Sequence, residues 1–205
     1  MDDGVRLAAE AFGKLSPERN IGDQVAGDGV AHFLRRRDVG VGEDFVLEAN
    51  FFEHPENIGA ELDAGTNLAE FIGLLAKNFP GKKLALSCAP TERERGKMAE
   101  LLALLPQKPW RVFAGNLNLA QVTAVIRHSA LHFCGDTGTL HLAVMTQTPV
   151  VAWFWPNPGW REWVPAGDKY RVIVGANEAG AAHLGKISTD DLVTAAQSVL
   201  QSVET

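Results

Sequence analysis

The 205-residue sequence contains few cysteines and no long apolar run. Its two cysteines are too few for the disulfide framework of a small secreted domain. Cys88 and Cys134 each end an apolar stretch, so we expect buried, reduced thiols in a cytoplasmic protein, with a disulfide as the less favoured alternative. No run of about 18 apolar residues occurs, so no membrane-spanning helix is predicted. The acidic start, Met1-Asp2-Asp3, does not resemble a signal peptide.

Positive charge is also scarce. The net charge is −6, and the run Arg35-Arg36-Arg37 is too short to form a basic surface, so we predict no nucleic-acid or anionic-membrane partner. No lysine or arginine occurs between Arg37 and Lys77. The histidines do not follow a metal-ligand spacing, so we expect neither a metal site nor a cofactor.

From Phe45 onward, short apolar runs alternate with stretches of helical spacing. Strands are predicted over 45–51, 83–88, 110–114, 130–134, 149–154 and 170–174. Helices are predicted over 67–78, 91–105, 118–128 and 138–145, and from Ser188 to the C-terminal region. This alternation is typical of α/β folds with a doubly wound parallel, Rossmann-like sheet, whose common strand order is 3-2-1-4-5-6.

Residues 1–44 have a different pattern. They are rich in glycine, aspartate and arginine, with two modest helical patterns and no convincing strand. We therefore expect two parts: an N-terminal helical extension over 1–44, and a Rossmann-like domain over 45–205. The extension would pack on the domain or be partly flexible.

One turn stands out at the end of the fourth predicted strand. Asp136-Thr137-Gly138 separates that strand from a short helix, and the next buried strand follows at Pro149. A helix that begins at a strand's carboxyl end directs its backbone N–H groups and positive dipole end out of the sheet edge, which favours a phosphate or diphosphate. In the order 3-2-1-4-5-6 this turn lies at the switch point, where such folds bind ligands. The alternative is that Asp136 and Thr137 simply cap the helix.

The residues around this turn carry a family resemblance. Asp-Thr-Gly-x-x-His-Leu-Ala at 136–143, Thr-Pro-Val-Val-Ala at 148–152 and the tryptophan-rich loop that follows resemble the C-terminal half of glycosyltransferase family 9. That family comprises the ADP-heptose:lipopolysaccharide heptosyltransferases. The resemblance implies one half of a GT-B architecture, the half that holds the nucleotide-sugar donor, and a role in lipopolysaccharide biosynthesis.

The resemblance also implies two groups of donor-binding residues. The donor diphosphate and sugar would be lined by Asp136, Thr137, Gly138, Thr139 and His141. At the nucleoside end, Glu92 would accept from the ribose hydroxyls and Leu117 would lie against the adenine. Two of these residues have an alternative interpretation. His141 could be a hydrogen-bonded core residue, and Glu92 could be an acid that only stabilises the N-terminus of its helix. No catalytic residue is assigned.

The sequence departs from the family pattern at three points. The family's N-terminal domain, which carries the general base, is missing, and residues 1–44 fit only a remnant of its last helix. The lysine that normally follows the first strand and pairs with the diphosphate is also missing, and Phe154-Trp155-Pro156 replaces Phe-Gly-Pro. Two hypotheses follow. The chain is a donor-binding domain for an ADP-sugar that transfers with inversion only when another chain or domain completes it, or it is a non-catalytic binding or interaction module.

The loop after the fifth predicted strand is unusually rich in tryptophan. A core does not need four such rings in so short a segment, so they would stack on a base or sugar or cover a protein partner, including a second copy in a homo-oligomer. We favour the interface. The residues are Trp153, Trp155, Trp160 and Trp163.

Overall fold

A computed structural model describes residues 45–48, 60–154, 159–178, 181–183 and 187–204. All of them belong to the second of the two compact units into which the chain divides, Val39–Thr205, called here the sheet unit. The helical extension predicted over 1–44 lies outside the described residues.

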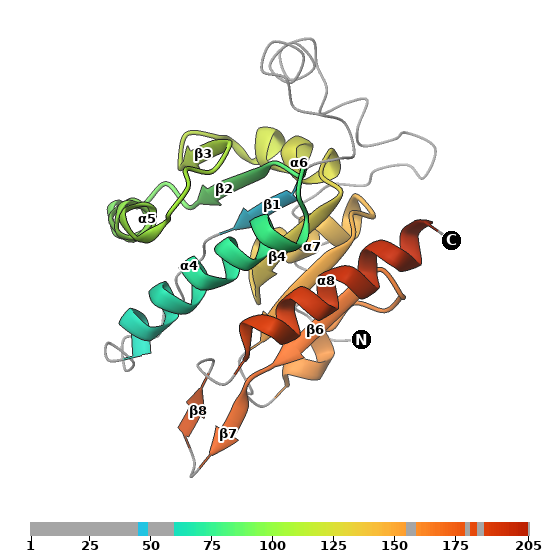
Figure 1. Cartoon of the computed structure of the whole chain (residues 1–205). Helices are drawn as coiled ribbons and strands as arrows, with labels where there is room; N and C mark the ends of the chain where they lie inside the picture. The colour runs from blue at the N-terminus through green and yellow to red at the C-terminus, as the bar shows by residue number, and fades with distance from the viewer. Residues whose placement is uncertain (1–44, 49–59, 155–158, 179–180, 184–186, 205) are drawn as a thin grey trace. The chain divides into compact units, whose positions relative to one another are not determined.

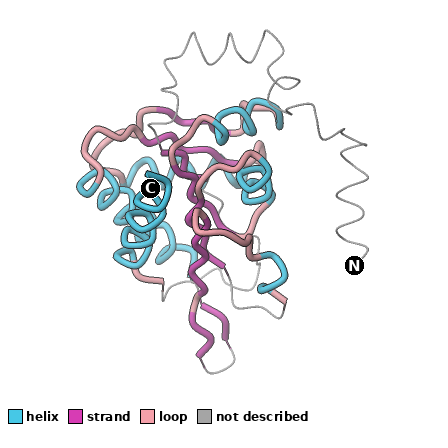
Figure 2. Tube along the Cα trace, turned by 90° about the vertical axis from the view of Figure 1, so that its right-hand side faces the viewer, coloured by secondary structure: helices cyan, strands magenta, loops and turns pink. Residues whose placement is uncertain are grey.

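The sheet unit is built on a six-stranded sheet with the order β3-β2-β1-β4-β5-β6, as predicted. Every neighbouring pair is parallel, so all carboxyl ends meet at one edge. Figure 2 shows the strands as a central layer with helices on both sides. The strands are β1 (Phe45–Glu48), β2 (Leu84–Cys88), β3 (Arg111–Ala114), β4 (Leu131–Gly135), β5 (Val150–Phe154) and β6 (Tyr170–Val174).

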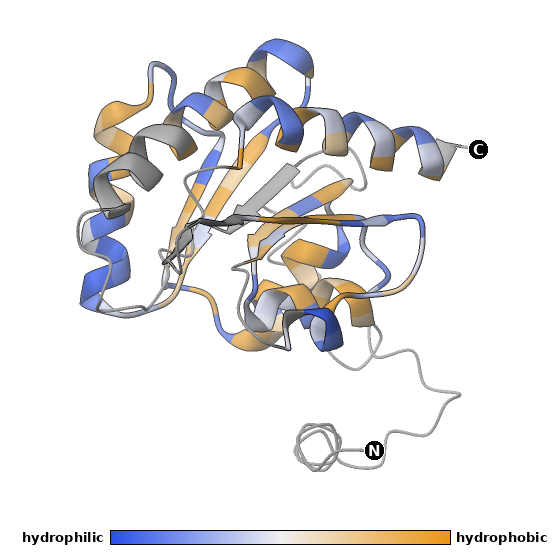
Figure 3. Cartoon of the chain, turned by 90° about the horizontal axis from the view of Figure 1, so that it is seen from below, coloured by the Kyte–Doolittle hydropathy of each residue, from blue (hydrophilic) through white to orange (hydrophobic). Residues whose placement is uncertain are grey.

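The helices cover both faces of this sheet. One face packs against α4, α5 and α8, and the other against α6 and α7 (Figures 1 and 3). Because side chains alternate along a strand, β4 supplies residues to both layers: Phe133 packs toward α4 and α8, and Cys134 toward α6 and α7. The helices are α4 (Ala60–Asn78), α5 (Glu92–Leu104), α6 (Leu119–Arg127), α7 (Gly138–Met145) and α8 (Thr189–Glu204).

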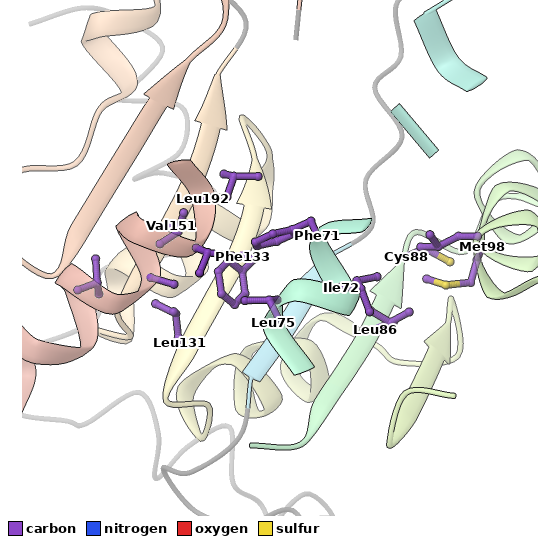
Figure 4. Packing of buried hydrophobic residues seen from close by; sticks show 14 residues of the cluster. Phe71, Ile72, Leu75, Leu86, Cys88, Met98, Leu131, Phe133, Val151 and Leu192 are labelled. Atoms are coloured by element: carbon purple, nitrogen blue, oxygen red, sulfur yellow. The ribbon is translucent and has the colours of Figure 1, made fainter. Parts of the chain in front are cut away.

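The larger core cluster lies between the sheet and α4, α5 and α8. Phe71 of α4 is fully buried and meets Phe133 of β4 edge-on, with ring centroids 5.3 Å apart (Figure 4). Cys88 is in the same cluster, near Met98, and Cys134 is in the cluster on the opposite face. Both cysteines are thus buried thiols, as predicted.

Three details differ from the predicted elements. Helix α4 begins at Ala60, earlier than the predicted residue 67, because the apolar residues at helical spacing on which the prediction rests start only at Leu68. A 3-10 helix, η1 (Trp160–Trp163), and an antiparallel pair, β7 (Ala176–Glu178) with β8 (Ala181–His183), were not predicted. Strands of three residues are too short to show a period-2 pattern. Predicted strand residues 49–51 lie outside the described residues.

Among the described residues, no helix combines the length and the apolar character needed to cross a bilayer.

The contact between Phe71 and Phe133 should contribute to the stability of the fold. Phe71→Ala leaves a cavity between α4 and β4, and we expect the free energy of unfolding to fall by about 3–5 kcal/mol. Chemical denaturation followed by circular dichroism measures it. Leu104→Ala is the control, because Leu104 is 55% exposed and its truncation should change the stability by less than about 0.5 kcal/mol. Equal effects of the two substitutions would contradict the packing described.

Candidate functional site

The predicted turn is present at the carboxyl edge of the sheet. Strand β4 ends at Gly135 and α7 begins at Gly138, with Thr137 as its N-cap residue in extended conformation. Gly138 is exposed, and an added Cβ would have no atom of the described residues within 4 Å. In the first helical turn the Leu140 N–H donates to the Thr137 carbonyl oxygen at 3.1 Å, whereas the N–H groups of Gly138 and Thr139 have no acceptor within the helix. This is the geometry of an anion site.

Hydrogen bonds connect the threonines at the start of α7 with the sheet. The Thr137 hydroxyl is bonded to the Thr139 hydroxyl, with 3.1 Å between the two oxygens, and does not cap α7 among the described residues. Thr139 Oγ1 is in turn 3.2 Å from Nε2 of His132, a fully buried residue of β4. Sequence reasoning missed His132. The available signal was a polar residue inside an apolar strand, because buried polar groups need hydrogen-bond partners.

Asp136 and His141 lie on the outer side of the turn. Burial raises the pKa of the half-buried Asp136 carboxyl, and the charge of His141 partly opposes this by lowering it. His141 is exposed, so the alternative that it is a core residue is wrong. Its ring meets Trp163 of η1 edge-on, at 5.6 Å between centroids. The turn thus presents a carboxylate acceptor and an imidazole beside the helix N-terminus.

The two residues predicted for the nucleoside end follow β2 and β3. Thr91 caps α5 by accepting from the Glu94 N–H at 3.2 Å, and Glu92 is exposed in the first turn. Leu117 is half-buried and directly precedes Asn118, which forms a capping box with Gln121 at the start of α6. Both loops are thus held by their helix caps.

A close backbone contact joins these two loops. Gly115 has φ +70°, and an added Cβ would lie 2.3 Å from Cα of Pro90 and 3.0 Å from the Ala89 carbonyl oxygen. The segment before Glu92 and the segment before Leu117 therefore touch. Since neighbouring strands are about 4.8 Å apart, β2 lies about 10 Å from β4, with β1 between them. The two groups of predicted residues share one sheet edge.

Some of the segments that bear on the predicted site lie outside the described residues. Residues 49–59, which follow β1 in the middle of that edge, are outside the described residues, as is the departure at Trp155-Pro156. In the part of the chain that the structure describes, no group of three or more histidine, cysteine, aspartate or glutamate side chains is placed to hold a metal ion.

The tryptophans do not all share one exposed surface. Trp153 is half-buried and packs against the larger core cluster, which differs from the expectation that it belongs to an interface. Trp163 is 48% exposed and contacts His141. Trp155 and the side chain of Trp160 lie outside the described residues.

The strand order and the helix N-terminus at the switch point define the class: a Rossmann-like half of the GT-B type. The family model described as glycosyltransferase family 9 (heptosyltransferase) matches residues 56–191, more than half of the chain. The chain therefore belongs to glycosyltransferase family 9. No curated protein sequence matches it closely.

Solved structures support the same fold. The glycosyl transferase family 9 structure from Veillonella parvula DSM 2008 has a TM-score of 0.68 at 17% identity, covering 85% of this chain and 51% of that one. E. coli ADP-heptose lps heptosyltransferase II has a TM-score of 0.67 at 19% identity, covering 88% and 53%. E. coli heptosyltransferase WaaC with ADP-2-deoxy-2-fluoro heptose has a TM-score of 0.58 at 19% identity, covering 82% and 47%. The chain spans about half the length of these relatives.

The contact between the two nucleoside-end loops is testable. Gly115→Ala places a Cβ against Pro90 in a left-handed conformation, so we expect the free energy of unfolding to fall by about 2 kcal/mol. Gly96→Ala is the control, since Gly96 of α5 has open space around it and should gain about 0.5–1 kcal/mol. Urea denaturation measures both. An unchanged stability of the Gly115→Ala variant would contradict the close approach.

The raised pKa of Asp136 predicts a pH dependence of stability. A carboxyl whose pKa is higher in the folded state binds its proton more tightly there, so its effect on stability becomes unfavourable as pH rises above the unfolded value of 3.8. We expect Asp136→Asn to raise the unfolding free energy slightly at pH 7, with the gain disappearing below about pH 4. Denaturation curves at both pH values test this. A gain that grows on acidification would have the wrong sign.

Proposed function

We propose that the sheet unit binds a nucleotide-diphosphate sugar of the ADP-heptose type across the carboxyl edge of its sheet. The observation that carries the proposal is the exposed start of α7 at Gly138, with open space above it, directly beyond the fully buried strand β4. Family membership supports the ligand class. So do the names of the similar structures, one of which contains ADP-2-deoxy-2-fluoro heptose.

Each end of the donor has a chemical counterpart in this proposal. The N–H groups of Gly138 and Thr139, together with a helix dipole worth about half an elementary charge, would hold the diphosphate. The Asp136 carboxylate would accept from sugar hydroxyls, and His141 would stand beside it. Glu92 would accept from the ribose hydroxyls, and Leu117 would cover the adenine.

For the reaction, we propose transfer of the sugar with inversion, onto a lipopolysaccharide acceptor, in the cytoplasm. A base removes a proton from the acceptor hydroxyl, the new glycosidic bond forms as the bond to the diphosphate breaks, and ADP leaves. The base and the acceptor site would come from another domain or chain. The leaving diphosphate gains negative charge, so the positive end of α7 would assist its departure. The buried thiols fit a reducing compartment.

One observation favours a second candidate, a non-catalytic binding module. A leaving diphosphate is normally stabilised by a cation, yet no lysine or arginine occurs between Arg37 and Lys77. The same segment contains the acids Glu48, Glu53, Glu56, Glu61 and Asp63. Trp163 would then contact a protein partner. Release of ADP from an ADP-sugar by the full chain with its acceptor separates the two candidates.

Titration calorimetry with ADP tests the binding proposal. We expect micromolar affinity, and we expect Gly138→Ala to weaken it at least about tenfold, because the new methyl group would obstruct the approach of the diphosphate to the first N–H groups.

The fold should tolerate that substitution, because the site above Gly138 is open. Gly96→Ala adds the same methyl group to another open helical glycine and should leave the affinity unchanged. If the folded wild-type chain gives no heat with ADP or an ADP-sugar, the proposed function is wrong.

A further inference from the structure

The buried histidine of β4 is connected to the start of α7. His132 is fully buried on the sheet face that packs against α6 and α7, and its Nε2 lies 3.2 Å from Thr139 Oγ1. Burying an imidazole inside an apolar strand is unfavourable unless its ring nitrogens are hydrogen-bonded. Its neighbours along the strand, Leu131 and Phe133, are apolar core residues of the other face.

The contact continues outward from the core. Thr139 Oγ1 lies 3.1 Å from Thr137 Oγ1, and Thr137 is the residue from which α7 starts. A chain of three polar groups thus runs from the interior of the sheet to the exposed turn at Gly138. Each threonine hydroxyl has a single proton to donate, so a Thr139 that donates to His132 has none left for Thr137, whereas a Thr139 that accepts from His132 can donate to Thr137.

The chain has two possible directions with opposite results. If His132 Nε2 carries the proton, it donates to Thr139, Thr139 donates to Thr137, and the Thr137 hydroxyl keeps its proton for a group outside. If Nε2 accepts, Thr139 donates to His132 and Thr137 donates to Thr139. The lone pairs of Thr137 then face outward, where they would repel an anion. Only the first direction suits a diphosphate.

We propose that His132 is a positioning residue of the donor site, which holds Nε2 protonated and thereby makes the Thr137 hydroxyl a donor to the diphosphate. This inference rests on the proposed function, since the diphosphate is the group that receives the bond. His132 touches no ligand itself and acts only through Thr139.

Two substitutions interrupt the chain at different places. His132→Leu removes the first donor, and Thr139→Val removes the middle hydroxyl with little change of volume. Each should weaken ADP binding about tenfold, the gain expected from a bond to a charged acceptor, and the double variant should lose no more than either single one. His132→Gln keeps an N–H donor and should restore most of the affinity.

Thr148→Val is the matched control. Thr148 is also a buried hydroxyl on this side of the sheet, donating to the Ile126 carbonyl oxygen at 3.2 Å, but it lies beyond the other end of α7. Its loss should lower the melting temperature and leave the ADP affinity unchanged. If His132→Leu behaves in the same way in a chain that binds ADP, the positioning role is overturned and the proposed function stands.

A second measurement does not depend on ADP. Nitrogen-15 NMR of the full chain identifies the ring nitrogen of His132 that carries the proton, and we expect Nε2. A proton on Nδ1 alone overturns the inference, whether or not ADP binds. If the wild-type chain binds no ADP, the proposed function and the diphosphate contact both fail, and a protonated Nε2 then supports only the direction of the hydroxyl chain.

Discussion

The site depends on the burial of β4 between two helical layers. This strand is buried at every residue and pairs on both sides, with β1 and with β5. Phe133 anchors it against Phe71 of α4, while Cys134 packs toward α6 and α7. The end of a strand fixed in this way has little freedom, so the residues that follow Gly135 start α7 at a defined place. A rigid strand is what a preorganised anion site requires, because a mobile one would lose entropy on binding.

Two electrostatic effects oppose each other at this site. The start of α7 attracts an anion, but the net charge is −6 and Asp136 stands in the turn itself, with a pKa that burial raises. The charged form of this carboxyl is less stable in the folded protein than it would be in water. Local costs in folding free energy of this kind are common at functional sites. Hydrogen-bond donors then matter more than net charge. The donors that we propose are the N–H groups of Gly138 and Thr139 and the Thr137 hydroxyl.

Much of the fold could be predicted because its signals are local. The alternation of apolar runs with helical spacing led to the observed strand order, and the bounds of α7 and β6 were predicted to the residue. The hydroxyl chain from His132 to Thr137 could not be predicted, because it depends on how α7 folds back over β4. The contact between Gly115 and Pro90 joins two loops from different strands, so no spacing in the sequence reveals it. Local periodicity predicts elements, whereas these contacts arise from tertiary packing.

We propose above that the diphosphate of an ADP-sugar lies over the start of α7. A crystal of the full chain soaked with ADP tests this placement most directly. We expect a phosphate oxygen within hydrogen-bond distance of the Gly138 and Thr139 N–H groups, with the ribose toward Glu92 and the adenine toward Leu117. ADP bound elsewhere, or an empty α7 N-terminus at saturating ADP, would contradict it.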